Sequence, residues 1–131
     1  MTASSYANVQ ARAETPRETE IRAFRFVNGL LATAKDAASR STALHKTYRL
    51  WSILLNDLAS PDCKLPPELR GNLISLGLWA QREAMARMSD DGEIQPLIAL
   101  HRDMIEALEA QAPAPVPARP AAPQRLGLVS A

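Results

Sequence analysis

Two neighbouring apolar segments decide the fold: Leu44-His45-Lys46-Thr47-Tyr48-Arg49-Leu50-Trp51-Ser52-Ile53-Leu54-Leu55-Asn56-Asp57-Leu58 and Leu65-Pro66-Pro67-Glu68-Leu69-Arg70-Gly71-Asn72-Leu73-Ile74-Ser75-Leu76-Gly77-Leu78-Trp79-Ala80. In the first, large residues recur three or four positions apart, the spacing of one helix face. In the second, charge is absent between Arg70 and Arg82, and apolar residues point in nearly every direction, which is typical of a central helix. Pro61 ends the first helix and Pro66-Pro67 begins the second, because proline lacks an amide donor and is tolerated in a first turn. The segments therefore predict an antiparallel helical hairpin.

A further helix is expected before this hairpin. Thr15 is placed as its N-cap, Pro16 as its first residue and Glu18 as the partner that completes a capping box. Apolar residues at helical spacing predict that the helix runs over 16–37. A polar connection over 36–41 follows, and Ser41 or Thr42 is expected to cap the next helix.

The two ends of the chain differ in character. Apolar residues repeat on one face from Ile94 to Ala110 and predict a last helix, with Pro96 tolerated in its first turn. Residues 3–13 have helical spacing but are too few to form a stable isolated helix, so they must dock on the body or on a partner. From Ala112 onward prolines alternate with alanines, a composition that cannot build a core and favours extended conformations.

Together these segments predict an all-α protein, an antiparallel bundle of four to five helices over residues 1–111. Residues 112–131 are expected to be a disordered Pro/Ala-rich C-terminal tail. The composition agrees with helix, since only 5% of residues are aromatic and no run of alternating β-branched residues predicts a strand.

Charge and cysteine content exclude several classes of protein. The formal net charge is +1, which argues against direct nucleic-acid binding and gives no reason to expect a membrane partner. The single cysteine, Cys63, cannot form an intramolecular disulfide and fits a reducing cytoplasm. The N-terminus lacks the pattern of a signal peptide, and no apolar stretch approaches the ~20 residues that span a bilayer. We therefore expect a soluble, cytoplasmic protein.

Catalytic machinery is not indicated by any motif. His45 and His101 lack a Cys or carboxylate at metal-binding spacing and are expected to be helical-surface or half-buried residues. No serine lies in a nucleophile context, and no glycine-rich loop could cradle a phosphate. The prediction is a protein that is not an enzyme and has no cofactor and no metal site.

An ordered set of short motifs resembles one family. The motifs are Tyr6-Ala7, Glu14-Thr15-Pro16-Arg17-Glu18-Thr19-Glu20, Leu50-Trp51, Leu65-Pro66-Pro67-Glu68-Leu69-Arg70 running into Leu73-Ile74-Ser75-Leu76-Gly77-Leu78-Trp79, and Pro96-Leu97-Ile98. In this order they resemble FlaF, a family of flagellar biosynthesis regulators of alphaproteobacteria, over residues 1 to about 110. The resemblance implies a non-enzymatic role in which the protein is required for flagellin production, binds flagellin, and acts with FlbT, a regulator that restrains flagellin mRNA translation.

The leading hypothesis from this resemblance is a cytoplasmic flagellin-binding secretion chaperone that promotes flagellin synthesis and filament assembly. Flagellin monomers have amphipathic terminal helices, which a small helical bundle could cover by helix-in-groove recognition. The alternative is a post-transcriptional regulator that acts on flagellin mRNA translation directly or through FlbT. A third hypothesis is an adaptor that only stabilises another regulator.

We expect the partner-binding surface to lie between the leading segment and the hairpin. Aromatic residues at helical spacing are most often core, yet tryptophan and tyrosine are also enriched at binding hot spots. The candidate apolar anchors are Tyr6, Phe24, Tyr48, Trp51 and Trp79, and the candidate rim charges are Arg17, Arg22 and Arg49.

Overall fold

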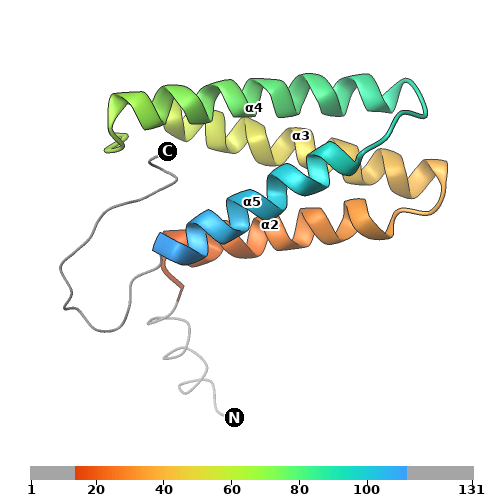
Figure 1. Cartoon of the computed structure of the whole chain (residues 1–131), viewed down its shortest axis with the longest axis horizontal. Coiled ribbons are helices and arrows are strands. Elements are labelled where there is room, and N and C mark those ends of the chain that lie inside the picture. The colour runs from red at the N-terminus through yellow and green to blue at the C-terminus, as the bar shows by residue number, and fades with distance from the viewer. Residues whose placement is uncertain (1–13, 112–131) are drawn as a thin grey trace, which may run out of the picture.

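Four helices make up the part of the chain that the computed structural model describes, residues 14–111. They are α2 (Pro16–Thr33), α3 (Ala37–Ala59), α4 (Pro67–Met88) and α5 (Gln95–Gln111) (Figure 1). Residues 14–111 contain no strand, so the all-α prediction is confirmed. The predicted helix over 3–13 and the predicted tail over 112–131 lie outside the described residues.

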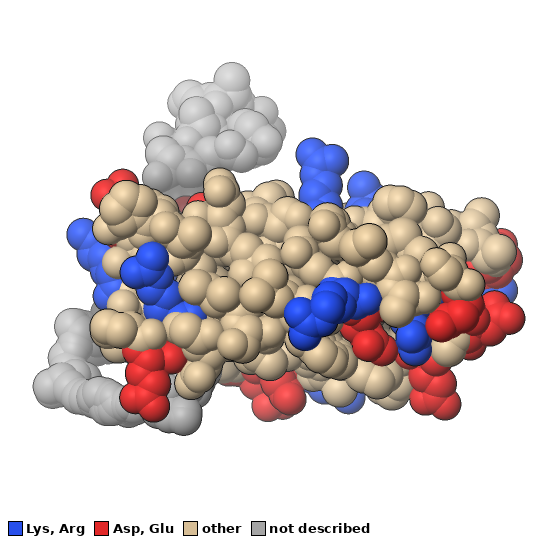
Figure 2. Space-filling model, turned by 90° about the horizontal axis from the view of Figure 1, so that it is seen from above, with Lys and Arg blue, Asp and Glu red and all other residues tan. Residues whose placement is uncertain are grey.

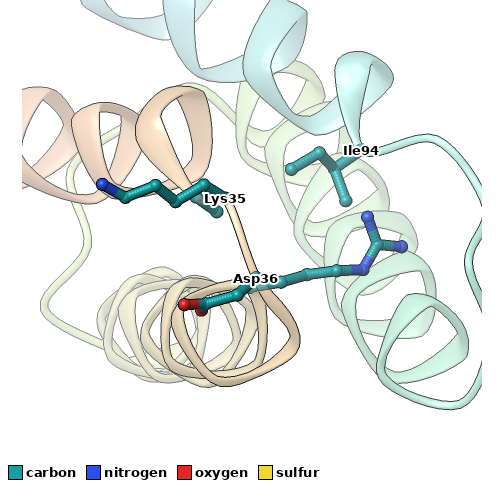
Figure 3. Close-up of a pocket in the computed structure, with 5 residues that line it drawn as sticks. Lys35, Asp36 and Ile94 are labelled. Atoms are coloured by element: carbon teal, nitrogen blue, oxygen red, sulfur yellow. The ribbon is translucent and has the colours of Figure 1, made fainter.

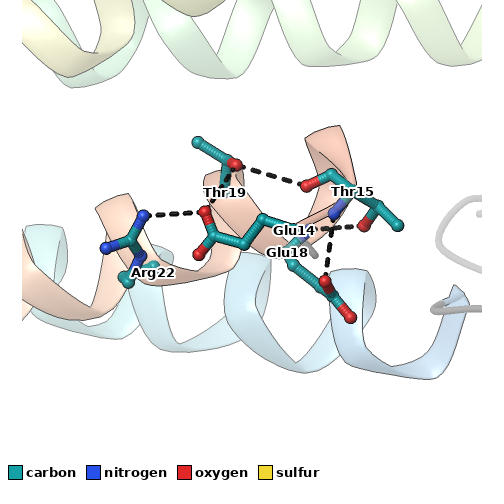
Figure 4. A network of polar contacts seen from close by, with 5 residues as sticks. All are labelled: Glu14, Thr15, Glu18, Thr19 and Arg22. Carbon is teal, nitrogen blue, oxygen red and sulfur yellow. Dashed lines mark hydrogen bonds and ion pairs between the residues drawn. The ribbon is translucent and has the colours of Figure 1, made fainter. Parts of the chain in front are cut away.

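The start of α2 is the capping box that the sequence predicts. The Thr15 hydroxyl oxygen accepts a hydrogen bond from the Glu18 amide at 3.1 Å, and a Glu18 carboxylate oxygen accepts one from the Thr15 amide at 3.0 Å (Figure 4). Glu14 adds a second layer to this network, because its carboxylate accepts from Thr19 at 3.1 Å and from Arg22 at 2.7 Å. The capping box thereby satisfies the Glu18 amide, one of the donors that a helix leaves unpaired at its N-terminus, and the Thr15 amide that precedes the helix.

The connection between α2 and α3 differs from the prediction. Helix α2 ends at Thr33 rather than at residue 37, and the N-cap of α3 is Asp36 rather than Ser41 or Thr42. The Asp36 carboxylate accepts from the Ser39 amide at 2.8 Å, and the Ser39 hydroxyl accepts from the Asp36 amide at 3.2 Å. The pKa of the Asp36 carboxyl is lowered by the bond from the Ser39 amide and, next, by the Ser39 hydroxyl, which donates to the same carboxylate at 2.7 Å. The expected cap was wrong because a reciprocal Asp–Ser pair already satisfies the helix start five residues earlier.

Proline marks the other two helix starts as expected. Pro66 occupies the N-cap position of α4 and Pro67 is the first residue of that helix, where no side chain caps the backbone. Pro96 is the second residue of α5, in the first turn. Both placements are confirmed, since a missing amide costs nothing where no intrahelical bond would form.

Helix α3 is central in the bundle, and α4 lies at its edge. Helix α3 packs extensively on α4 and also on α2, whereas α4 touches α5 only slightly; α5 runs obliquely across the bundle and packs mainly on α2 (Figure 1). The expectation that the apolar segment around 65–80 is the central helix is therefore wrong. The buried residues of α4 are small ones, Gly77, Ala80 and Ala84, so its larger apolar side chains are not all used in the core.

Close packing of α3 against α4 depends on Gly77. A Cβ atom at this position would lie 2.7 Å from Leu55 Cδ2 and 3.0 Å from Trp51 Cε3, closer than side chains normally approach. The absence of a side chain thus lets the two helices approach here, a use of glycine that depends on space rather than on backbone conformation.

Arginine side chains near the ends of helices donate hydrogen bonds to backbone carbonyls of neighbouring segments. Arg40 donates to the carbonyl of Gly92 at 2.5 Å and to that of Asp90 at 3.4 Å, which ties the α4–α5 loop to the start of α3. Arg17 donates to the carbonyl of Gln111 at 2.5 Å, so the start of α2 lies beside the end of α5. Carbonyl groups left unpaired at helix ends favour such cationic donors.

Candidate partner-binding surface

Two of the predicted anchors, Phe24 and Trp51, are core residues. Their exposed fractions are 0% and 1%, and their rings meet edge to face with centroids 5.6 Å apart. A partner docking on the surface of this bundle would not touch either side chain. Their large buried area and their geometry explain a structural role, because aromatic pairs of this kind stabilise cores.

His101 completes this cluster and is fully buried, so the prediction of a surface or half-buried histidine is wrong. The indole N–H of Trp51 donates to His101 Nε2 at 3.0 Å, and the Phe24 ring lies 5.4 Å from the imidazole. Burial lowers the pKa of His101 to about 4, which keeps the ring neutral and able to accept at Nε2. Because α5 presents His101 on the same face as Leu97 and Ile98, the core pattern of α5 includes it.

The remaining predicted residues lie on two different parts of the bundle, and Tyr6 lies outside the described residues. Arg17 and Arg22 are on α2, where Arg17 bonds the end of α5 and Arg22 pairs with Glu14 (Figure 4). Tyr48 and Trp79 are half-buried against the core, and Arg49 is exposed on α3. The participation of these residues in binding a partner stays a prediction.

A candidate surface that the sequence analysis missed is the outer side of α4. Leu78 and Met85, which lie two turns apart on the same side of the helix, are 45% and 56% exposed, and no charged residue interrupts positions 71–81. Leu76 is 38% exposed but points to nearly the opposite side, because it lies two positions before Leu78. Helix α4 is uppermost in Figure 1, and the view from above shows a broad surface on which uncharged residues predominate (Figure 2). The sequence does show apolar residues on every side of α4, from which this surface could have been predicted. It was missed because α4 was assigned to the centre of the bundle, where all these residues would be buried.

Small-molecule and metal sites have little support among the described residues. A pocket of about 250 Å³ lies where the α2–α3 turn faces the start of α5, with Lys35, Asp36 and Ile94 around it (Figure 3). Typical ligand pockets occupy roughly 300–1,000 Å³. Residues 14–111 contain no group of three or more His, Cys, Asp or Glu residues placed to hold a metal ion, and none of the four helices has the length and apolarity needed to cross a membrane.

Comparison with known proteins identifies the family. The model of the flagellar protein FlaF family matches residues 2–108, which is most of the chain. The chain therefore belongs to the FlaF family of flagellar proteins. No curated protein and no solved structure gives a significant match.

Proposed function

We propose that this FlaF-family protein is a cytoplasmic chaperone that binds flagellin monomers and promotes flagellin synthesis and filament assembly. The observation that supports this function best is the outer side of α4. It presents exposed apolar side chains and no charge over 71–81, on a helix that covers the edge of the bundle. Exposed apolar surface that is contiguous marks protein interaction sites.

The amphipathic terminal helices of flagellin have the complementary chemistry. Outside the filament their apolar faces lack a partner, and a helix laid along α4 would cover them by helix-in-groove recognition. Leu78 and Met85 are already about half covered, so their complete burial contributes on the order of 1 kcal/mol each. This favours a reversible complex, which a chaperone that must release its subunit for export requires. The flexible Met85 side chain can also adapt to more than one partner surface.

Binding of this kind would couple chaperoning to regulation. Flagellin held on α4 could not assemble early, and the fraction of unoccupied protein would report the flagellin supply. We include FlbT as a second partner, through which that signal would reach the flagellin message. The alternative, direct action on the mRNA, has one observation in its favour: residues 37–56 and 69–82 contain five Lys or Arg and no Asp or Glu.

The test is a calorimetric titration of purified flagellin monomer into the full chain at low and high salt, with size-exclusion chromatography of the mixture. We expect a discrete complex that survives high salt, because apolar burial is not screened. Leu78→Ser combined with Met85→Ser should weaken it, whereas Phe26→Ser, which changes a residue 58% exposed on α2, should not. No complex at either salt concentration would reject the chaperone function. Binding to the flagellin message that falls steeply with salt would support the mRNA alternative.

A further inference from the structure

We infer that one side of the α3–α4 hairpin is a docking surface for an acidic amphipathic helix. We call this side the hairpin face and define it by Lys46, Arg49, Ile53, Leu78, Arg82 and Met85. The apolar stripe of the bound helix would lie on Ile53 and Leu78, and its carboxylates would pair with Arg49 and Arg82. The inference rests on the proposed function only in its use of α4, and it adds a selectivity for charge that the proposed function does not contain.

Hydrogen bonds between the two helices fix which residues share this side. Gln81 donates to the carbonyl of Tyr48 at 3.2 Å and to the hydroxyl of Ser52 at 2.7 Å, so these residues mark the line of contact between α3 and α4. Arg49 and Arg82 each follow a contact residue by one position. A step of one residue rotates a side chain by about 100° around a helix.

The residues that follow a contact residue on α3 and those that do so on α4 lie on the same side of the hairpin. The helices are antiparallel, so the same rotation away from the contact line turns the side chains of both toward one side. Ile53 follows Ser52, and Leu78 follows Gly77, which lies against Leu55, so both obey the same rule. Trp51 and Ala80, which precede contact residues, are buried on the opposite side, in the core. The hairpin face therefore points away from the core.

The charges on the hairpin face have one sign and no ion-pair partner within the part of the chain that the structure describes. The arginines Arg17, Arg40 and Arg70 bond carbonyls, and Arg22, Arg25 and Arg87 pair with carboxylates. Within residues 14–111, no ion pair involves Lys46, Arg49 or Arg82. Arg49 and Arg82 flank the same Tyr48–Gln81 hydrogen bond, so two like charges share one level of the hairpin. Such charges repel each other, and an acidic partner would relieve that repulsion.

The apolar residues between these charges favour a helix over a polyanion as the occupant. Ile53 is 55% exposed and lies one turn from Arg49, while Leu78 and Met85 are two turns apart on α4 with Arg82 between them. Phosphate groups of RNA would neutralise the cations but would leave these apolar side chains in water. A helix with an apolar stripe bordered by Glu or Asp satisfies both kinds of residue.

The experiment uses three synthetic 18-residue helical peptides with identical leucine stripes flanked by Glu, Gln or Lys. Fluorescence anisotropy measures their binding to the full chain at low and high salt. We expect the Glu peptide to bind roughly tenfold more tightly than the Lys peptide at low salt, and the difference to shrink with salt. Arg49→Glu combined with Arg82→Glu should reverse that order. Arg102→Glu is the matched control, since Arg102 is an exposed arginine on α5, and it should change nothing.

Three results would overturn the inference. They are equal affinity for the Glu and Lys peptides, no response to the double charge reversal in a variant shown by circular dichroism to be folded, and no binding of any peptide. A 20-nucleotide RNA or an anionic vesicle that binds more tightly than the Glu peptide, and loses binding in the double variant, would show a general polyanion surface and would also overturn it. If flagellin binds and responds to Leu78→Ser but not to the charge reversals, the proposed function stands and this inference fails. If the Glu peptide binds but flagellin does not, this inference stands and the proposed function fails.

Discussion

Replacing His101 with glutamine should remove a specific part of the pH dependence of stability. His101 is fully buried, accepts a hydrogen bond from Trp51, and has its pKa lowered by burial from 6.5 to about 4. The folded protein therefore keeps the ring neutral at pH values where the unfolded chain protonates it. Stability from this source is complete above about pH 6.5 and is lost as the pH falls to about 4. At roughly 1.4 kcal/mol per pH unit, the loss amounts to about 3 kcal/mol.

Urea unfolding followed by circular dichroism between pH 7.5 and pH 4 measures this loss as a free energy of unfolding. Glutamine does not titrate and can still accept from the Trp51 indole, so His101→Gln should start from a different stability but lose about 3 kcal/mol less over the same range. His45→Gln is the matched control, because it makes the same substitution at the other histidine, which is exposed. Glu20, whose pKa is raised by burial, acts in the opposite direction, but it is present in all three proteins and cancels in the comparison. Superimposable pH profiles for the wild type and His101→Gln would refute the reasoning.

Three further substitutions test the packing and the helix ends, each by thermal and urea unfolding. Gly77→Ala should destabilise the protein by about 1–3 kcal/mol because the new Cβ would lie 2.7 Å from Leu55. Gly71→Ala, where a Cβ would have no atom within 4 Å, should instead stabilise it by about 0.5–1 kcal/mol. Equal effects of the two substitutions would contradict the close approach of α3 and α4. Arg40→Ala should cost about 1–3 kcal/mol by leaving loop carbonyls unpaired, and an unchanged melting temperature would show that the bonds contribute nothing. Thr15→Ala should cost about 1 kcal/mol, and a loss below the error of the measurement would argue against the capping box.

The sequence predicted those features of the fold that depend on local chemistry. The capping box at Thr15 and the first-turn positions of Pro67 and Pro96 follow from which backbone donors a helix leaves unpaired, and the structure has all three. The cap at Asp36 was missed because the small residues after it were assigned to the connection, although Ala37 and Ala38 favour helix and Ser39 completes the cap with Asp36. Local patterns identify the helices more reliably than their ends.

The position of α4 could not be read from its sequence. Because α4 has apolar residues on every side, several of its faces could pack on the bundle. In the structure the face with small residues packs, and Gly77 allows α3 to approach closely there. The candidate surface was missed for the same reason, because the large residues of α4 were assigned to the core. The net charge of the whole chain also gave no sign of the charged surface on the hairpin. The value of +1 for the chain conceals the hairpin face, whose cations make no ion pair within residues 14–111, and only the pairing of α3 with α4 shows Arg49 and Arg82 on one side.

The contact between α2 and α5 joins the most distant parts of the described chain, since the hydrogen bond from Arg17 to Gln111 spans 94 residues. On the ribosome, α5 is the last of the four helices to emerge, and it supplies Leu97, Ile98 and His101 to the core. Until then Phe24 and Trp51 lack the helix that covers them, because long-range contacts cannot form before their later partner exists. From the synthesis of Trp51 in α3 until α5 emerges, the nascent chain thus lacks the helix that covers its own aromatic pair, so a protein proposed to protect the apolar surface of another chain has its own core incomplete during that interval.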